Sequence, residues 1–110
     1  MKNRVQLIGR LGQNPEVKEF EKGRKLVRFS LATNEEYANN AGEKVKQTTW
    51  HNLVAWGKLA EICEKYLKKG NEVAVEGKLI YRNWDDKEGA KHYMTEIHLN
   101  EMLMLDGKAS

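Results

Sequence analysis

Apolar and polar residues alternate along much of the chain, and the most informative alternation runs from Thr48 to Trp56. In a β-strand, alternate residues share a face. One face of this strand would carry Trp50, Asn52, Val54 and Trp56. Branched aliphatic residues usually fill a core face, whereas two large rings on one face suit a platform for stacking nucleic-acid bases. Leu53 and Ala55, on the opposite face, provide an inward side.

Four further stretches alternate in the same way and predict strands: Val5 to Leu11, Lys25 to Asn34, Asn71 to Trp84 and Tyr93 to Leu105. Glu16 to Phe20 could form a further short strand. The polar stretch from Glu35 to Lys44 predicts a long exposed hairpin loop with Tyr37 near its base. In the strand that ends at Trp84, the expected core face holds Val73, Val75, Gly77, Leu79 and Tyr81. The outer face holds Lys78, Ile80, Arg82 and Trp84.

One stretch has the period of a helix instead. Apolar residues recur every three or four positions, at Leu59, Ile62, Cys63, Tyr66 and Leu67, which predicts an amphipathic helix. Gly70 is a natural residue to terminate it. The order of three or more strands, one helix and two strands predicts an all-β fold with one helix. Specifically, it favours a five-stranded Greek-key barrel with the helix between strands 3 and 4, the oligonucleotide/oligosaccharide-binding (OB) fold.

The chain has 110 residues, enough for one domain with a modest core. We expect residues 1–105 to form a single OB-fold domain and residues 106–110 to form a flexible C-terminal end. The formal net charge of +3 is compatible with a polyanionic partner. A single cysteine, Cys63, permits no disulfide within the chain, and no apolar run approaches the roughly 18 residues that span a membrane. These features favour a cytoplasmic protein without a membrane partner.

The outer face of the strand that ends at Trp84 combines charge and a ring. Backbone phosphates of a nucleic acid would pair with Lys78 and Arg82 while a base stacks on Trp84. The plain alternative is a solvated strand face, but solubility alone poorly explains an exposed tryptophan at the end of a basic strip. The rings of the earlier strand have a similar alternative as core tryptophans, and Tyr37 in its loop could be incidental.

Other residue types offer little support for catalysis. The three histidines, His51, His92 and His98, lack the Cys/His spacing of zinc sites and have no evident nucleophile partner. Asp85 and Asp86 are neighbours in a turn and would project differently, so they make a poor catalytic pair. We therefore expect no enzymatic activity, no metal and no other cofactor.

Several segments resemble a known family when they are taken together and in order. They are NRVQLIGRLGQNPE, RFSLATNE, TTWHNLVAWGKLAEICEKYLKKG, VAVEGKL, and RNW followed by an acidic turn. Over nearly the whole chain they resemble the bacterial single-stranded DNA-binding protein (SSB) family, and WHNLVAWGKLAE followed by YLKKG is quite specific to it. The resemblance implies an OB-fold that assembles as a homotetramer and wraps single-stranded DNA without sequence choice.

The resemblance also implies roles for particular positions. Family stacking aromatics match Trp50, Trp56, Trp84 and, where many members have Trp, Tyr37. Family basic positions match Arg4, Lys58, Lys69 and Arg82, and the strand pattern adds Lys78 as a phosphate ligand. The chain departs from the family at Asn52 and Ile80, where other members often have Arg, which points to fewer phosphate contacts.

A second departure concerns the C-terminus. Members of the family usually continue into a flexible tail whose acidic tip recruits replication and repair enzymes. The last six residues here contain one acid and one base. We therefore expect replication and repair proteins as partners only if a C-terminal tail is present in the full-length protein.

Together these observations favour a non-enzymatic protein that binds and protects single-stranded DNA in bacterial replication, recombination and repair, in the cytoplasm and associated with the nucleoid. A replication-restart or RNA-preferring OB-fold protein is the nearest alternative, since the same rings and charges would serve it. An OB subunit that binds only protein is a second alternative, and the basic strip beside Trp84 argues against it. A nuclease is a distant third.

Overall fold

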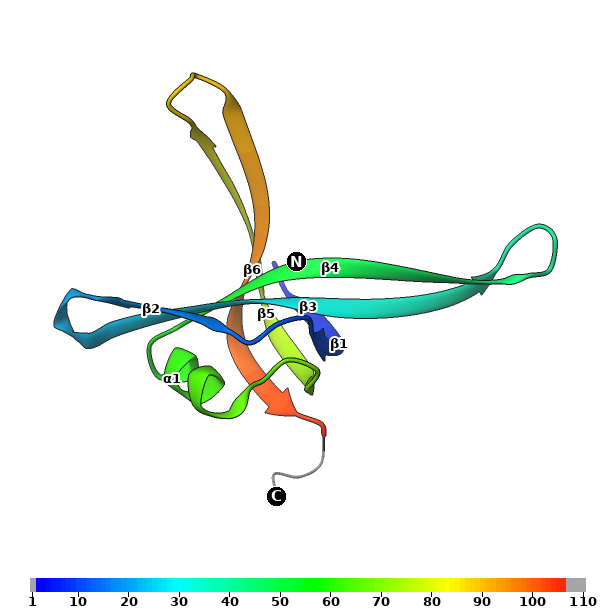
Figure 1. The fold of residues 1–110 in the computed structure, drawn as a ribbon, viewed down its shortest axis with the longest axis horizontal. Coiled ribbons are helices and arrows are strands. Elements are labelled where there is room, and N and C mark those ends of the chain that lie inside the picture. Colours follow the sequence, from blue (N-terminus) through cyan, green and yellow to red (C-terminus); the bar gives the residue numbers. More distant parts are fainter. Residues whose placement is uncertain (1, 107–110) are drawn as a thin grey trace.

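The computed structural model describes residues 2–106, which form a small β-barrel with hairpin arms projecting from it (Figure 1). In chain order the elements are β1 (Val5–Leu11), β2 (Glu16–Phe20), a 3-10 turn (Glu21–Gly23), β3 (Arg24–Ala38), β4 (Lys44–Trp56), α1 (Gly57–Tyr66), β5 (Glu72–Asp85) and β6 (Lys91–Met104). The strands are hydrogen-bonded in the order β1-β5-β6-β4-β3-β2, and β3 also pairs with β1. This extra pairing closes a barrel of β1, β3, β4, β5 and β6, with β2 added outside β3.

The predicted architecture is therefore confirmed, because α1 lies between the third and fourth strands of a closed five-stranded barrel. Two contacts complete the barrel: the end of β1 pairs with β3, at Leu11 and Leu31, and β4 pairs in parallel with β6, at Leu53 and Ile97. All four of these side chains are buried. The core thus forms where strands far apart in the chain turn their inward faces toward one another.

Two glycines allow the barrel strands to approach closely. A Cβ at Gly9 would lie 2.2 Å from the carbonyl oxygen of Ala32, and one at Gly77 would lie 2.2 Å from that of His98. Both distances are far below van der Waals contact. Gly77 also lies at a β-bulge, where the pairing of β5 with β6 shifts its register, and such bulges help a strand bend around a barrel.

The helix buries a narrower face than its apolar pattern predicts. Ala60, Cys63 and Leu67 are buried against the barrel, as expected for Cys63 and Leu67. Ile62 and Tyr66 are exposed, so the prediction that they face the core is wrong. Ala60, Cys63 and Leu67 are spaced three or four residues apart and so share one side of the helix, and this side, rather than the one through Ile62 and Tyr66, packs on the barrel.

The arms correct two further predictions. Half of the stretch from Glu35 to Lys44 is strand, since β3 continues to Ala38 and β4 begins at Lys44, and residues 39–43 form the turn between them. Tyr81 is 74% exposed, although the alternation assigns it to the core face. Both differences have one cause: β3, β4, β5 and β6 extend beyond the barrel as two-stranded arms (Figure 1). There the backbone ladder persists but no core lies opposite either face.

His51, expected to face inward, is half-buried, and its Nε2 lies 2.9 Å from the Thr33 hydroxyl oxygen. In residues 2–106, no helix has the length and apolar character needed to cross a membrane. The expected flexible end at residues 106–110 lies outside the described residues except for Asp106. The carboxylate of Asp106 accepts hydrogen bonds from the Asn71 side chain and the Glu72 backbone.

Candidate nucleic-acid interface

A hollow of about 250 Å³ lies between the β2–β3 hairpin and the base of the β5–β6 arm, and we call it the central hollow. Its lining includes Phe20, Arg28, Val54, Trp56, Arg82 and Glu96. Val54 shares a strand face with Trp50 and Trp56, yet it is buried, because β6 pairs alongside it at His98. The face that carries the tryptophans is therefore partly the floor of a hollow and partly open surface.

On one side of the central hollow, Trp56 forms a stacked pair with Phe20. Their ring centroids are 6.1 Å apart and the ring planes differ by 24°. Trp56 is 43% exposed, so one end of this ring pair remains open to solvent. The sequence analysis missed Phe20. In the sequence, Phe20 is marked only as an aromatic residue at the end of a short strand. The structure shows that all five residues of this strand, β2, are exposed.

A second ring pair lies on the β5–β6 arm, where Trp84 and His92 are cross-strand partners. Their ring centroids are 5.4 Å apart, with planes 17° from parallel. The Arg82 guanidinium carbon lies 5.7 Å from the Trp84 ring centroid, within cation–π range. The hydrogen bond from His92, followed by those from the Ala90 and Glu88 backbones, holds the pKa of Asp86 below its usual value despite partial burial. The stacked His92 ring and the nearby Arg82 guanidinium fix the orientation of the Trp84 ring, which is itself 43% exposed.

Trp50 lies in a separate place. It is 57% exposed, and it lines a hollow of about 350 Å³ with Tyr93 and Met94, between β4 and the β5–β6 arm. Its ring packs on the backbone of Gly12, where an added Cβ would lie 2.4 Å from a ring carbon. Tyr37 lies farther out, on the β3–β4 arm opposite Val45, and is exposed. All four predicted stacking residues are thus at the surface.

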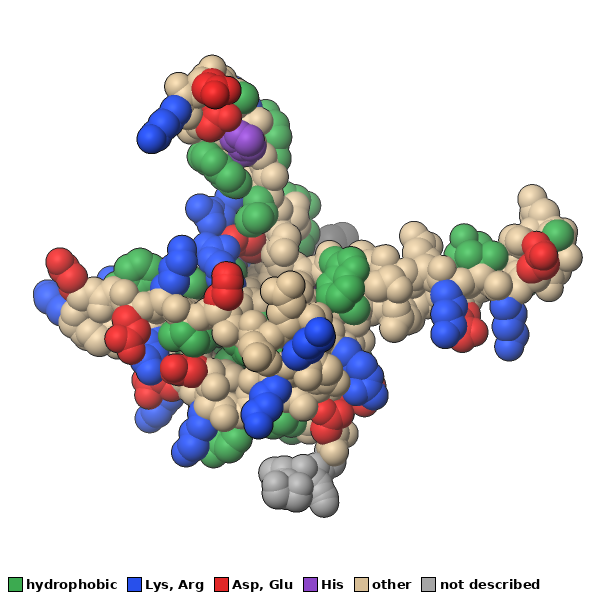
Figure 2. Space-filling model, viewed as in Figure 1, with side chains coloured by type: hydrophobic (Ala, Val, Ile, Leu, Met, Phe, Trp, Pro, Cys, Tyr) green, Lys and Arg blue, Asp and Glu red, His purple; other side chains and the backbone are tan. Residues whose placement is uncertain are grey.

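The predicted basic residues do not all lie together. Arg82 lines the central hollow, and Lys78 is exposed on the same face of β5, opposite His98. Lys58 and Lys69 are exposed near the two ends of α1. Figure 2 shows Lys and Arg side chains close to acidic ones around the base of the β5–β6 arm.

Arg4 lies away from the central hollow, on the outer face of β1 and β5. It forms an ion pair with Glu76, with 2.9 Å between the guanidinium nitrogen and the carboxylate oxygen. Hydrogen bonds from Gln6 and then from Arg4 lower the pKa of Glu76 from its usual value. The structure therefore does not bring Arg4 together with Arg82.

Glu96 is the one buried acidic residue among those described, and it lies beneath the central hollow. Its carboxylate is 1% exposed and accepts hydrogen bonds from Arg28 at 2.5 Å and Arg82 at 3.2 Å. His98 Nε2 lies 3.1 Å from its other oxygen. Burial, the largest single effect, raises the pKa of Glu96, but the Arg28 and His98 hydrogen bonds and the two guanidinium charges outweigh it and hold the pKa below its usual value.

Sequence analysis missed both Arg28 and Glu96. Each lies in a stretch of simple alternation, and nothing local marks either residue, because the contact joins positions 68 residues apart. Among residues 2–106, no group of three or more His, Cys, Asp or Glu side chains is arranged to hold a metal ion. The surface around the central hollow offers exposed rings beside arginines.

Comparison with known proteins gives consistent matches. Residues 2–105 match the model of the single-strand binding protein family. The chain is 50% identical over 109 residues to single-stranded DNA-binding protein 1 of Chlorobaculum tepidum, covering 98% of this chain and 67% of that protein. It is 46% identical over 107 residues to single-stranded DNA-binding protein 1 of Xylella fastidiosa, covering 96% and 79%. The fold matches that of a Plasmodium falciparum SSB in complex with ssDNA, with a TM-score of 0.90, 36% identity, and coverage of 96% of this chain and 97% of that chain.

Proposed function

Because this chain belongs to the single-strand binding protein family, we propose that it binds and protects single-stranded DNA, without sequence choice, in replication, recombination and repair. The family consists of non-catalytic DNA-binding proteins, so the chain is not an enzyme. The observation that carries the proposal is the presence of two partly exposed ring pairs beside an arginine-lined hollow. Stacking on such rings tolerates any sequence, because every base has a π-face.

In this proposal, bases stack on Trp50, Trp56, Trp84 and Tyr37. The exposure of all four rings supports the assignment, and Phe20 would act with Trp56 because the two rings are already stacked. Preformed ring pairs lose little conformational entropy when a base is added, which favours binding.

Phosphates would contact Arg4, Lys58, Lys69, Lys78 and Arg82. Support is strongest for Arg82, which lies beside Trp84 and lines the central hollow. Support is weakest for Arg4, since Glu76 already neutralises it.

Residues 1–105 would act as one DNA-binding domain in the bacterial cytoplasm, at the nucleoid. Replication and repair proteins would bind only through a C-terminal tail in the full-length protein.

The function is tested by titrating intrinsic tryptophan fluorescence with oligo(dT) and with an RNA of matched length. We expect strong quenching by oligo(dT), because the exposed tryptophans would stack on bases, and weaker quenching by RNA. Equal affinity for RNA would favour the RNA-binding alternative. No quenching and no gel shift at low salt would contradict nucleic-acid binding altogether.

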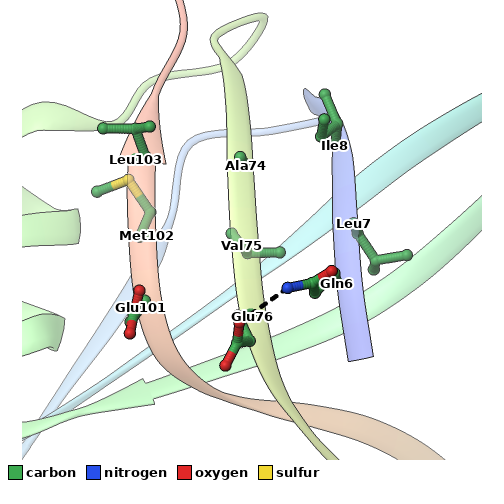
Figure 3. Close-up of a pocket in the computed structure, with 9 residues that line it drawn as sticks. All are labelled: Gln6, Leu7, Ile8, Ala74, Val75, Glu76, Glu101, Met102 and Leu103. Atoms are coloured by element: carbon green, nitrogen blue, oxygen red, sulfur yellow. Dashed lines mark hydrogen bonds between the residues drawn. The ribbon is translucent and has the colours of Figure 1, made fainter. Parts of the chain in front are cut away.

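We also propose that the protein assembles as a homotetramer. The supporting surface is an apolar hollow of about 700 Å³ on the outer face of β1, β5 and β6. Figure 3 shows Ile8, Ala74 and Leu103 side by side across these strands, with Gln6, Glu76 and Glu101 in a second row. Ile8 is 61% exposed and Leu103 is 64% exposed, so covering this face would remove large apolar side chains from water.

The edge of β1 supports the same proposal. β1 pairs with β5 along most of its length, but with β3 only at Arg10 and Leu11. Within residues 2–106, the segment from Val5 to Ile8 therefore pairs with one strand, β5. An open edge next to an exposed apolar face readily pairs with another strand. A second copy of this chain would supply both a strand for the edge and an apolar face for the hollow.

A further inference from the structure

We propose that Arg28 and Arg82, together with the buried carboxylate of Glu96, form a seat that binds one backbone phosphate of single-stranded DNA. We call this set the two-arginine seat. The inference rests on the proposed binding of single-stranded DNA. It adds Arg28 as a direct phosphate ligand and Glu96 as the residue that positions the two arginines and sets the charge of the seat.

The geometry places both guanidinium groups over one carboxylate oxygen. Arg28 Nη1 and Arg82 Nη1 both donate to Oε2 of Glu96. The two arginines come from β3 and β5, so Glu96, on β6, brings together cations from opposite walls of the central hollow. Two guanidinium groups that converge in this way can bind a single phosphate group from both sides.

The arginines retain donors for a ligand. A guanidinium group has five N–H donors, and in the described part of the chain each of these two side chains donates one hydrogen bond, to Glu96. The side chains are 33% and 45% exposed, respectively, whereas Glu96 is 1% exposed. The free donors therefore reach solvent in the hollow while the carboxylate stays beneath them.

The charges fit one phosphate. Two arginines carry two positive charges, and the ionised Glu96 neutralises one of them. The lowered pKa of Glu96, maintained against burial by the arginines and His98, keeps the carboxylate ionised at neutral pH. One positive charge then remains on the three groups of the seat, which a single phosphodiester balances. Lys18, which also lines the hollow, adds a second positive charge beside the seat, and His98 lies there too.

The position of the seat suits a nucleic-acid strand. Trp56 and Phe20 line the same hollow, and Arg82 lies 5.7 Å from the Trp84 ring on its other side. The seat therefore lies between the two ring pairs. A base stacked on either pair would bring its backbone toward the arginines, which is the alternation of ring and cation found in single-strand binding sites.

The test measures how the affinity for a 5′-labelled oligo(dT) of about 10 nucleotides, within the range that one OB fold covers, changes with salt. Each phosphate neutralised contributes about 0.7 to the slope of log affinity against log salt for single strands. We expect Arg28→Ala and Arg82→Ala each to make the slope shallower by about 0.7, so that affinity falls about 2.6-fold less between 50 mM and 200 mM salt. Arg28→Lys, which keeps the charge, should keep the slope and lose part of the affinity.

The matched control is Arg10→Ala, which removes the same charge. Arg10 lies 2.9 Å from the Gly70 carbonyl oxygen and 3.7 Å from Asp106, outside the central hollow. Its slope should equal that of the wild type. If Arg10→Ala and Arg28→Ala changed the slope equally, net charge alone would explain the result and the seat would be wrong.

Two further variants test the sharing of one phosphate. Removing both arginines would leave Glu96 buried and unpaired, which is strongly destabilising, so the double substitution is combined with Glu96→Gln. The triple variant should lose about 0.7 from the slope, as each single arginine variant does. A loss of about 1.4 would mean that each arginine holds its own phosphate. Glu96→Gln alone should steepen the slope, because the second arginine would no longer be neutralised internally and could neutralise a further phosphate of the strand; an unchanged slope would contradict the role of Glu96 in setting the charge.

Circular dichroism spectra and melting temperatures of all variants confirm that the measured proteins are folded. If Glu96→Gln does not fold, the single arginine variants still decide the proposal, because Glu96 keeps one partner in each. Absence of binding by the wild-type protein would overturn the proposed function and the seat together. Normal wild-type binding with an unchanged slope in Arg28→Ala would overturn the seat alone.

Discussion

Among single residues, the tryptophans have the most direct expected effect on binding. Base stacking contributes about 1–3 kcal/mol per base, so Trp56→Ala and Trp84→Ala should each weaken oligo(dT) binding by this amount. Both side chains are partly exposed, so the fold should remain intact. Fluorescence anisotropy of a labelled oligonucleotide measures the affinity.

Tyr66→Ala is the matched control for these substitutions. Tyr66 is an exposed aromatic residue on α1 that lines neither hollow described above. Its removal should leave the affinity unchanged. Unaltered binding by both tryptophan variants would contradict the stacking assignment.

Glu96 also has an expected effect on stability at acidic pH. Because its pKa in the folded protein lies below the ordinary value of 4.5, its ionisation stabilises the fold above that value. This stabilisation is lost as the pH falls through the folded-state pKa. The melting temperature of the wild type should therefore drop between pH 6 and pH 3 by more than that of Glu96→Gln.

The comparison of these two proteins isolates Glu96 from other acids. Glu76 and Asp86 also have lowered pKa values, but both remain in the variant. An equal drop in melting temperature for wild type and Glu96→Gln would show that Glu96 is not selectively stabilised in its ionised form.

At the scale of elements, the contact between β5 and β6 at Gly77 is a sensitive point of the barrel. An added Cβ would lie 2.2 Å from the His98 carbonyl oxygen, so Gly77→Ala must separate the strands at the bulge. Overpacking of this kind costs about 1–3 kcal/mol. Urea denaturation measures the loss of unfolding free energy.

Lys78→Ala serves as the control at the next position. Lys78 is exposed, so its truncation should change the unfolding free energy by less than about 0.5 kcal/mol. If Gly77→Ala were as stable as Lys78→Ala, close approach of the strands would not be the reason for glycine at this position.

The elements also show why some predictions failed. The alternation in β5 correctly places Val73 and Val75 in the core, but the same rule assigns Tyr81 to it. Alternation reports which residues share a face, and it does not report where the strand leaves the barrel. The polar stretch after Asn34 was interpreted as a loop for the same reason. A two-stranded arm satisfies its backbone hydrogen bonds without burying either face, so it needs no apolar residues.

For the whole molecule, the principal prediction concerns assembly. We expect light scattering to give the mass of four chains at micromolar concentration. Ile8→Glu should dissociate the tetramer, because it places a charge in the apolar row formed with Ala74 and Leu103. Each released chain should remain folded, since Ile8 is exposed in the single chain.

Ile62→Glu is the control for this substitution, since Ile62 is an exposed isoleucine on α1 and does not line the apolar hollow. It should leave the mass unchanged. A wild-type protein with the mass of one chain would contradict the proposed tetramer. Equal dissociation by both substitutions would show that the interface lies elsewhere.

The sequence by itself determined the properties that depend on neighbouring residues. Period-two alternation put Trp50 and Trp56 on one strand face and Leu53 and Ala55 on the other, and the structure exposes the first pair and buries the second. Helical spacing located α1, and the order of elements led to the barrel. These inferences succeeded because the geometry of one strand or helix relates residues a few positions apart.

Only the tertiary structure decided which faces meet. It buried Val54 on the tryptophan face, stacked Phe20 on Trp56, and brought Arg28 to Glu96 from a position 68 residues away. The closure of the barrel determines these contacts, and no local pattern encodes the pairing of β3, β5 and β6 around one carboxylate. A buried carboxylate is costly unless it is paired, and Arg28 is paired with Glu96 across 68 residues of sequence, so Glu96 could be recognised only after the strands were assembled.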